Sequence, residues 1–130
     1  MTRAARIVAA ARATIGARFR PHGRDPALGL DCVGVAVWAL AAGGWHGRVP
    51  AGYALAAGAA AVAPEMLDGL VACDGAAAGD LLLCRAGGGL HLAIRTEAGV
   101  VHADAGLRRV VERPGAPPWP VLAAYRLEGE

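Results

Sequence analysis

Apolar residues near the start of the chain recur every three to four positions, with arginines between them. This period predicts an amphipathic helix from Thr2, its cap, to about Gly16. Farther along, residues 32–40 are apolar nearly all round, which is typical of a central helix that is covered on several sides. The pair Gly43-Gly44 is predicted to end that helix.

The segment between these two helices is predicted to be irregular. Pro21, Gly23 and Pro26 interrupt both helix and strand formation within residues 18–26. Because the segment leads directly into the central helix, it is expected to form a loop beside the start of that helix, where binding residues often concentrate. Two weaker helices are predicted after the central one, at residues 53–63 and 64–71.

Beyond residue 75 the pattern changes from helical to extended. Short apolar runs, often β-branched and separated by glycine or proline, predict strands at residues 81–84, 90–95, 99–104, 108–113 and 121–127. Their short connections favour an antiparallel meander. Helices first and strands afterwards is the α+β arrangement, here N-terminal helices with a central helix packed on an antiparallel sheet of about five strands. No repeat or linker divides residues 1–130, so one domain is predicted.

Composition restricts the possible chemistry. The chain has no Ser, Asn, Gln or Lys, and all 13 of its basic residues are Arg. A serine nucleophile is therefore excluded, and so is an asparagine that orients a catalytic histidine. The net charge of +2 comes without a run of one sign that would follow a phosphate backbone, which argues against nucleic acid as a partner.

The three cysteines, Cys32, Cys73 and Cys84, are odd in number and widely spaced. They predict neither a disulfide framework nor a zinc–thiolate site, and no metal or other cofactor is expected. No stretch reaches the roughly 20 apolar residues of a membrane span, and the apolar run near the N-terminus is too short for a signal peptide. The expected protein is made in the cytoplasm and has no membrane partner.

Cys32 is the first candidate for chemistry. Asp31 is a good helix N-cap, so Cys32 is expected in the first turn of the central helix. There the unpaired backbone N–H groups and the helix dipole favour a thiolate and lower the pKa of a cysteine. The alternative is that Cys32 is a small buried apolar residue, as most free cysteines are.

Two of the four histidines fall on consecutive predicted strands. If the loop between these strands is centred between residues 97 and 98, His91 lies opposite Asp104 and diagonal to His102, and the three side chains share one face. If the centre lies one residue earlier, His102 is directly opposite His91. In either register a polar neighbour is able to fix the tautomer of the imidazole. A loop of odd length would place the two histidines on opposite faces. His22 and His46 are expected on exposed loops, with His22 near enough to Cys32 to contact a substrate.

Several short motifs occur in order along nearly the whole chain. They are Phe19-Arg20-Pro21-His22-Gly23, Leu30-Asp31-Cys32-Val33-Gly34-Val35, Gly79-Asp80-Leu81-Leu82, His91-Leu92-Ala93-Ile94 and Val101-His102-Ala103. Together they resemble the NlpC/P60 family of cysteine peptidases, in particular its compact versions found with phage tails and gene transfer particles. The resemblance implies a papain-like fold and hydrolysis of peptidoglycan stem peptides, typically between D-glutamate and a diamino acid. It also implies that Cys32 is the nucleophile, His91 the base and His102 the residue that orients the base.

Two positions depart from the pattern of the family that the motifs resemble. Phe19 stands where many members have a tyrosine, so a phenol that would contact the substrate or the developing oxyanion is missing. Val33 stands where many members have a serine, which mainly changes the packing of the helix. The side chains expected around the substrate or the oxyanion are those of Asp31, Phe19, His22 and Asp104.

The reaction predicted from these residues is acyl transfer to sulfur with a thioester intermediate, so the chain is expected to be an enzyme, a cysteine endopeptidase. One alternative is an amidase or acyltransferase that uses the same Cys–His pair. Another is a degenerate domain that binds cell-wall peptide or forms a structural part of a phage-tail-like particle, which the loss of the tyrosine motivates. The expected partners are a peptidoglycan stem peptide and, by resemblance, the proteins of a phage-tail-like particle that carries the chain to the cell wall.

Overall fold

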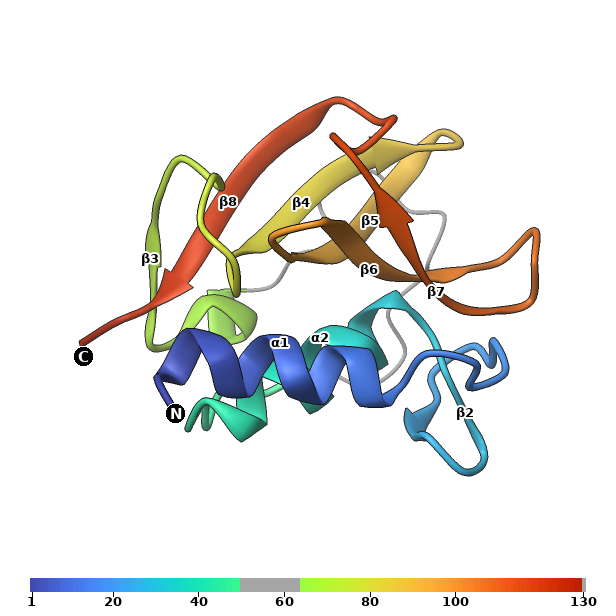
Figure 1. Cartoon of the computed structure of the whole chain (residues 1–130), viewed down its shortest axis with the longest axis horizontal. Helices are drawn as coiled ribbons and strands as arrows, with labels where there is room; N and C mark the ends of the chain where they lie inside the picture. Colours follow the sequence, from blue (N-terminus) through green and yellow to red (C-terminus); the bar gives the residue numbers. More distant parts are fainter. Residues whose placement is uncertain (50–63, 130) are drawn as a thin grey trace.

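Two helices lie against one side of a curved antiparallel sheet in this computed structural model, which describes residues 1–49 and 64–129 (Figure 1). Helix α1 spans Arg3–Ala13 and helix α2 spans Cys32–Ala42. The hydroxyl of Thr2 accepts a hydrogen bond from the Ala5 N–H and caps α1 as predicted. Helix α2 packs on β5 and β6 of the sheet, so the predicted α+β class is confirmed.

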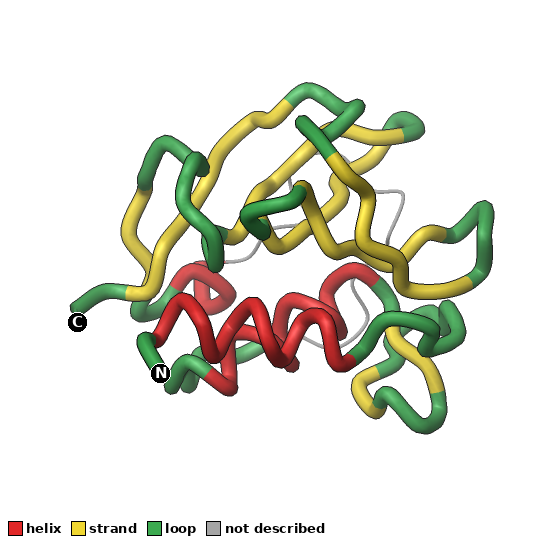
Figure 2. The backbone as a smooth tube through the Cα atoms, viewed as in Figure 1, coloured by secondary structure: helices red, strands yellow, loops and turns green. Residues whose placement is uncertain are grey.

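The sheet has six strands in the order β3-β8-β4-β5-β6-β7, and every neighbouring pair is antiparallel. The bounds are Leu70–Ala72 for β3, Leu81–Ala86 for β4, Gly89–Arg95 for β5, Gly99–Asp104 for β6, Arg109–Pro114 for β7 and Val121–Leu127 for β8. Strands β4 to β7 form the predicted meander (Figure 2). Strand β8 departs from it, because the chain returns to insert β8 between β4 and β3. The spacing of strands along the sequence does not reveal which neighbour a returning strand takes.

Residues 64–71 do not form the single short helix that the sequence predicts. Only Pro64–Leu67 is helical, as the 3-10 turn η2, and Gly69 then adopts a φ of +79° that ends the turn. The chain continues as β3, which pairs with β8 at the far end of the sequence. A strand of three residues that depends on so distant a partner leaves no periodic signal of its own. The helix predicted at residues 53–63 lies outside the described residues.

The central strands β4, β5 and β6 are buried on both faces. The main core lies between α2 and the sheet and includes Val35, Leu40, Ile94 and Val101. A smaller cluster holds Leu82, Cys84, Ala93, Val100 and Ala124, the alternate positions of the same strands. This double burial explains why these strands are almost continuously apolar. Among the described residues, no helix has the length and apolar character needed to cross a membrane.

The loop before Cys32 is packed tightly on the first turn of α2. It contains a small hairpin of β1, Arg24–Asp25, and β2, Gly29–Leu30. A Cβ atom at Gly34 would lie 2.2 Å from the carbonyl oxygen of Gly23, well inside van der Waals contact. Glycine at position 34 therefore allows the loop backbone to rest directly on the helix that carries the cysteine.

Gly34→Ala is expected to destabilise the protein by about 1–3 kcal/mol, the usual cost of overpacking, although alanine is intrinsically the better helix former. The added methyl group must push away backbone atoms of Gly23, which cannot rotate aside as a side chain can. Thermal unfolding followed by circular dichroism measures the change. Ala41→Gly, at an exposed position of the same helix, is the control and should cost only the propensity difference of about 1 kcal/mol. A melting temperature of Gly34→Ala at or above that of the wild type would contradict the packing argument.

Candidate active site

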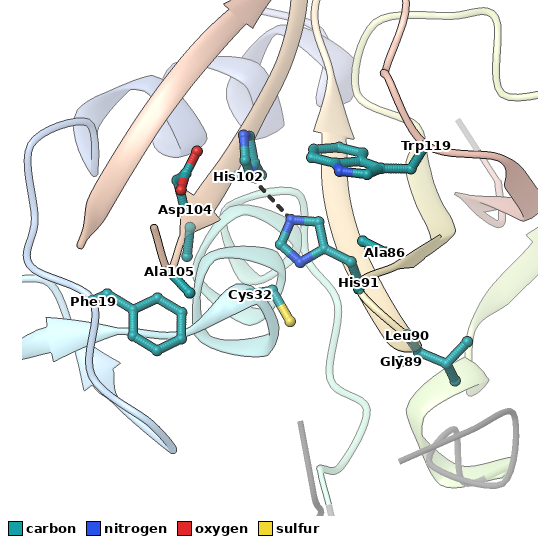
Figure 3. A pocket seen from close by; sticks show the side chains of 12 residues that line it. Phe19, Cys32, Ala86, Gly89, Leu90, His91, His102, Asp104, Ala105 and Trp119 are labelled. Carbon is teal, nitrogen blue, oxygen red and sulfur yellow. Dashed lines mark hydrogen bonds between the residues drawn. The ribbon is translucent and has the colours of Figure 1, made fainter. Parts of the chain in front are cut away.

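A cavity of about 470 Å³ opens beside the first turn of α2 (Figure 3). The side chains with chemical or aromatic character that line it are Cys32, His91, His102, Asp104, Phe19 and Trp119. They come from five parts of the chain: α2, β5, β6, which carries both His102 and Asp104, the loop before β1, and the connection between β7 and β8. The remainder of the lining is small or apolar and includes the β4–β5 hairpin.

Cys32 is the first residue of α2, as the sequence predicts. The carboxylate of Asp31 accepts a hydrogen bond of 2.7 Å from the Gly34 N–H and caps the helix. The helix start thus fixes the Cys32 backbone and leaves its sulfur facing the cavity (Figure 3). Cys32 is only 6% exposed, and the backbone of Leu92 on β5 is close enough to its thiol to act on the pKa.

Burial changes the expected ionisation of this cysteine. The pKa of Cys32 is raised to about 11: removal from water is the largest cause and the charge of Asp31 acts in the same direction, whereas backbone N–H groups at Leu92 and Val33 lower it. The prediction of a lowered pKa is therefore wrong. The helix terminus does act in the predicted direction, but exclusion of water outweighs it. The resting side chain is a neutral thiol, so the attack of sulfur on a substrate requires a base.

Asp31 is fully buried and does not line the cavity. Besides the Gly34 N–H, its carboxylate accepts a hydrogen bond of 2.7 Å from the backbone N–H of His22 and one of 3.1 Å from the Arg24 guanidinium. Asp31 thereby ties the preceding loop to the helix. The His22 imidazole is exposed and is not part of the cavity wall, so its predicted contact with a substrate stays a prediction.

The two histidines meet as the predicted register requires. Pairing of Ile94 with Val101 and of Arg95 with Val100 centres the loop between residues 97 and 98, and the even loop is confirmed. The rings of His91 and His102 lie on the same side, with 2.9 Å between Nε2 of His91 and Nδ1 of His102. The other nitrogen of the His91 ring lies on the side of the Cys32 sulfur (Figure 3).

Both imidazoles are neutral near pH 7. The pKa of His91 is lowered to about 4: burial is the largest cause and the neighbouring His102 acts in the same direction, against the charge of Asp104, which raises it. Burial also lowers the pKa of His102. A neutral His91 ring keeps a lone pair for a proton, so the site contains a neutral base beside a neutral thiol.

Asp104 is the weaker of the two candidate partners for His91. Its Oδ1 atom accepts a hydrogen bond of 2.9 Å from the Leu107 N–H and so caps the turn after β6. Its carboxylate acts on both histidines through charge and raises the pKa of each. The structure thus gives His91 a hydrogen bond to His102, and which of the two residues orients His91 in the reaction stays a prediction.

Sequence reasoning missed Trp119. The ring centroid of Trp119 lies 4.8 Å from that of His91 and 4.7 Å from that of His102. Its segment is rich in proline and carries no motif, so the only signal was a lone tryptophan between two predicted strands. Phe19, by contrast, was expected near the cysteine and does line the cavity.

The remaining candidate ligands do not gather into a metal site. Within residues 1–49 and 64–129, no group of three or more His, Cys, Asp or Glu side chains has an arrangement that would hold a metal ion. Cys84 is fully buried under the smaller core cluster, and Cys73 is packed at its margin. All three cysteines carry free thiols.

Comparison with known proteins adds a structural likeness to this geometry. A scan of protein-family models found no match to the chain, and a search of curated proteins found none either. A search of solved structures found the NlpC/p60 domain of the peptidoglycan hydrolase SagA, at a TM-score of 0.59. The two sequences are 27% identical, and the match covers 85% of this chain and 88% of that one.

The chain has an NlpC/p60-like fold. This confirms the predicted papain-like α+β architecture and supports the family that the sequence motifs resemble. In this NlpC/p60-like fold, the helix that starts at Cys32 and the strand that carries His91 together form the cavity.

Proposed function

We propose that the chain is a cysteine peptidase that hydrolyses an amide bond in peptidoglycan stem peptides. The observation that carries this proposal is the cavity in which the Cys32 thiol lies beside His91, with Nε2 of His91 2.9 Å from Nδ1 of His102. The similarity to a domain of a peptidoglycan hydrolase supports the choice of substrate. The bond between D-glutamate and a diamino acid is the specific target that the sequence motifs suggest.

The hydrogen bond between the imidazoles suits His91 for proton transfer. When Nε2 of His91 carries the proton and donates it to Nδ1 of His102, the Nδ1 lone pair of His91 is left on the side of the sulfur. His91 takes the proton from the Cys32 thiol as the sulfur attacks the amide carbon, and then gives it to the leaving amine. The same nitrogen next removes a proton from the water that attacks the thioester, and returns it to the Cys32 sulfur as the C–S bond breaks, which restores the thiol and releases the acid.

The backbone N–H of Cys32, at the open start of α2, is the donor we assign to the oxyanion. A preorganised donor of this kind is typically worth about 3–4 kcal/mol in the transition state. Phe19 contributes a ring and no donor, so the chain lacks the phenol that many proteins with these motifs have at this position. We infer that the Phe19 ring packs against the apolar part of the substrate.

The composition of the cavity wall fits a peptide with little side-chain bulk at its centre. Gly87 and Gly89 leave the β4–β5 side open, while Leu90 and Phe19 supply apolar surface. The carboxylate of Asp104 is the acidic group in the described lining, and it favours a substrate that carries an amino group there.

Mass spectrometry of purified muropeptides tests the proposed function. After incubation with the wild type, new products are expected whose masses correspond to cleavage within the stem peptide with addition of one water. Cys32→Ala serves as the matched control and should leave the muropeptides intact. Wild-type and variant digests that are identical, together with retention of both proteins on isolated cell walls, would support the alternative of an inert binding domain. Release of ammonia, or transfer of an acyl group without addition of water, would support the amidase or acyltransferase.

His102→Ala is expected to lower kcat/KM by roughly 10 to 100-fold, and Asp104→Ala by less. The hydrogen bond to His102 strengthens when His91 becomes charged, and such bonds contribute about 1.5–3 kcal/mol. Asp104 acts only through its charge, so its loss should matter less. Steady-state kinetics on a purified muropeptide compares the two variants. If Asp104→Ala were the more damaging change, the orienting role would belong to Asp104.

Delivery of the chain to the cell wall by a phage-tail-like particle stays a prediction from the sequence motifs. Co-purification of the chain with such particles is the measurement that tests it.

A further inference from the structure

Trp119 lies far from either histidine in the sequence, on the connection between β7 and β8, yet its ring contacts both. Its plane is inclined by 68° to the ring of His91 and by 76° to that of His102. The two imidazoles are themselves nearly perpendicular, at 86°, with 5.0 Å between their centroids. The three rings therefore form one edge-to-face cluster, a geometry that aromatic groups prefer.

We propose that Trp119 is a positioning residue that clamps the paired imidazoles, fixing the plane of the His91 ring and keeping water away from its hydrogen bond to His102. This inference rests on the proposed function, because it assigns a role in proton transfer at the same site. We assign Trp119 no contact with the reacting atoms.

The contacts of Trp119 explain how the clamp is held in place. On its inner side the ring packs against the smaller core cluster, which includes Cys84 and Val100. The Arg85 N–H donates a 3.0 Å hydrogen bond to the carbonyl of Pro120, so the segment is fastened to β4 directly after the tryptophan. Prolines at positions 117, 118 and 120 restrict the backbone around the ring. The ring is thus attached to rigid structure on one side and to the imidazoles on the other.

The charged and titratable groups around His91 show what an uncharged clamp contributes. Strand β6 presents His102 and Asp104, α2 presents the Cys32 thiol, and β4 presents Cys84 at the position paired with His91. On β7, Arg113 acts on His102 and lowers its pKa. Among the charges that act on His91, Asp104 favours the protonated ring, yet burial holds the pKa of His91 at about 4. Exclusion of water is therefore the dominant influence on the pKa of His91. Trp119 is a large apolar side chain in contact with the His91 ring.

Removal of the Trp119 ring should consequently shift the titration of His91. In Trp119→Ala the midpoint is expected to rise by about one pH unit or more, since burial accounts for shifts of up to several units. Trp119→Phe keeps an aromatic ring and should remain close to the wild type. NMR of the imidazole nitrogens measures the midpoint on the resting protein without substrate, and the acid limb of kcat/KM should move by the same amount. Trp38→Ala is the matched control, because Trp38 is a tryptophan of α2 that is 44% exposed and does not line the cavity.

The outcomes separate this inference from the proposed function. An unchanged His91 midpoint in folded Trp119→Ala, or a fall in kcat/KM that is equal at every pH, overturns the clamp. If Trp119→Ala does not fold, Trp119→Leu keeps apolar volume without the ring, and it is expected to show a partial shift with the same sign; no shift in that variant overturns the clamp as well. A wild type that cleaves no muropeptide contradicts the proposed function, while the NMR titration still reports on the clamp.

Discussion

Cys32→Ala should abolish cleavage of muropeptides while the protein stays folded. The nucleophile has no substitute in the cavity: the chain has no serine, and Cys73 and Cys84 do not line the cavity wall. Loss of the nucleophile from a catalytic triad lowers kcat by about 10⁶-fold in a well-characterised serine protease, and a loss of similar size is expected here. Quantitative chromatography of the products over long incubations measures the residual rate. The change removes a single buried sulfur, so the free energy of unfolding should fall by only about 1 kcal/mol.

Cys73→Ala is the matched control for this experiment. Cys73 is also a free thiol, but it is packed against the smaller core cluster and away from the cavity. Its replacement should leave kcat/KM within about twofold of the wild type. A Cys32→Ala protein that still cleaves at a rate near that of the wild type would exclude acyl transfer to this sulfur.

His91→Ala is expected to have almost as large an effect, about 10⁵ to 10⁶-fold in kcat. Burial raises the pKa of the Cys32 thiol to about 11, so almost none of it is ionised near pH 7 without a base. Loss of His91 removes the group that takes the proton and also the group that returns it to the leaving amine. Cys32 and His91 act as a unit, so the double variant should be hardly slower than either single variant.

The pH dependence distinguishes this mechanism from a permanent thiolate. His91 must be neutral to act as the base, and its pKa is lowered to about 4 by burial, so wild-type activity should persist well below pH 6.5 and fall only as the pH approaches 4. The same shift affects stability. The unfolded chain binds the proton at higher pH than the folded one, so the stability present above about pH 6.5 is lost progressively towards pH 4.

His46→Ala supplies the control for the histidine variants, because His46 is exposed and lies outside the cavity. It should retain the rate and the pH profile of the wild type. Partial recovery of His91→Ala by added imidazole would support a role in proton transfer, whereas full activity without imidazole would refute it.

Particular residues show which features of the fold and the site could be predicted from the sequence. The N-cap at Asp31 was predictable, since a carboxylate one residue before an apolar helix is a local signal. The register of β5 and β6 followed from an even loop, and with it the meeting of His91 and His102. Local patterns were not sufficient for β3, which exists only because β8 returns beside it, nor for Trp119, whose segment carries no motif.

The ionisation of Cys32 shows why other properties of the site could be learned only from the tertiary structure. A helix start lowers the pKa of a cysteine through the nearest peptide groups, which sequence order specifies directly. Burial raises the same pKa, and it depends on parts of the chain, such as β5, that meet α2 only after folding.

By itself, the amino-acid sequence determined the two long helices and most of the strands, the capped cysteine and the pairing of two histidines, because period, caps and short loops act over a few residues. The tertiary structure alone decided that β8 crosses to β4, that His102 rather than Asp104 is hydrogen-bonded to His91, and that the thiol and both imidazoles are neutral. These features depend on which distant surfaces exclude water from one another, and that exclusion arises only when the whole chain has packed.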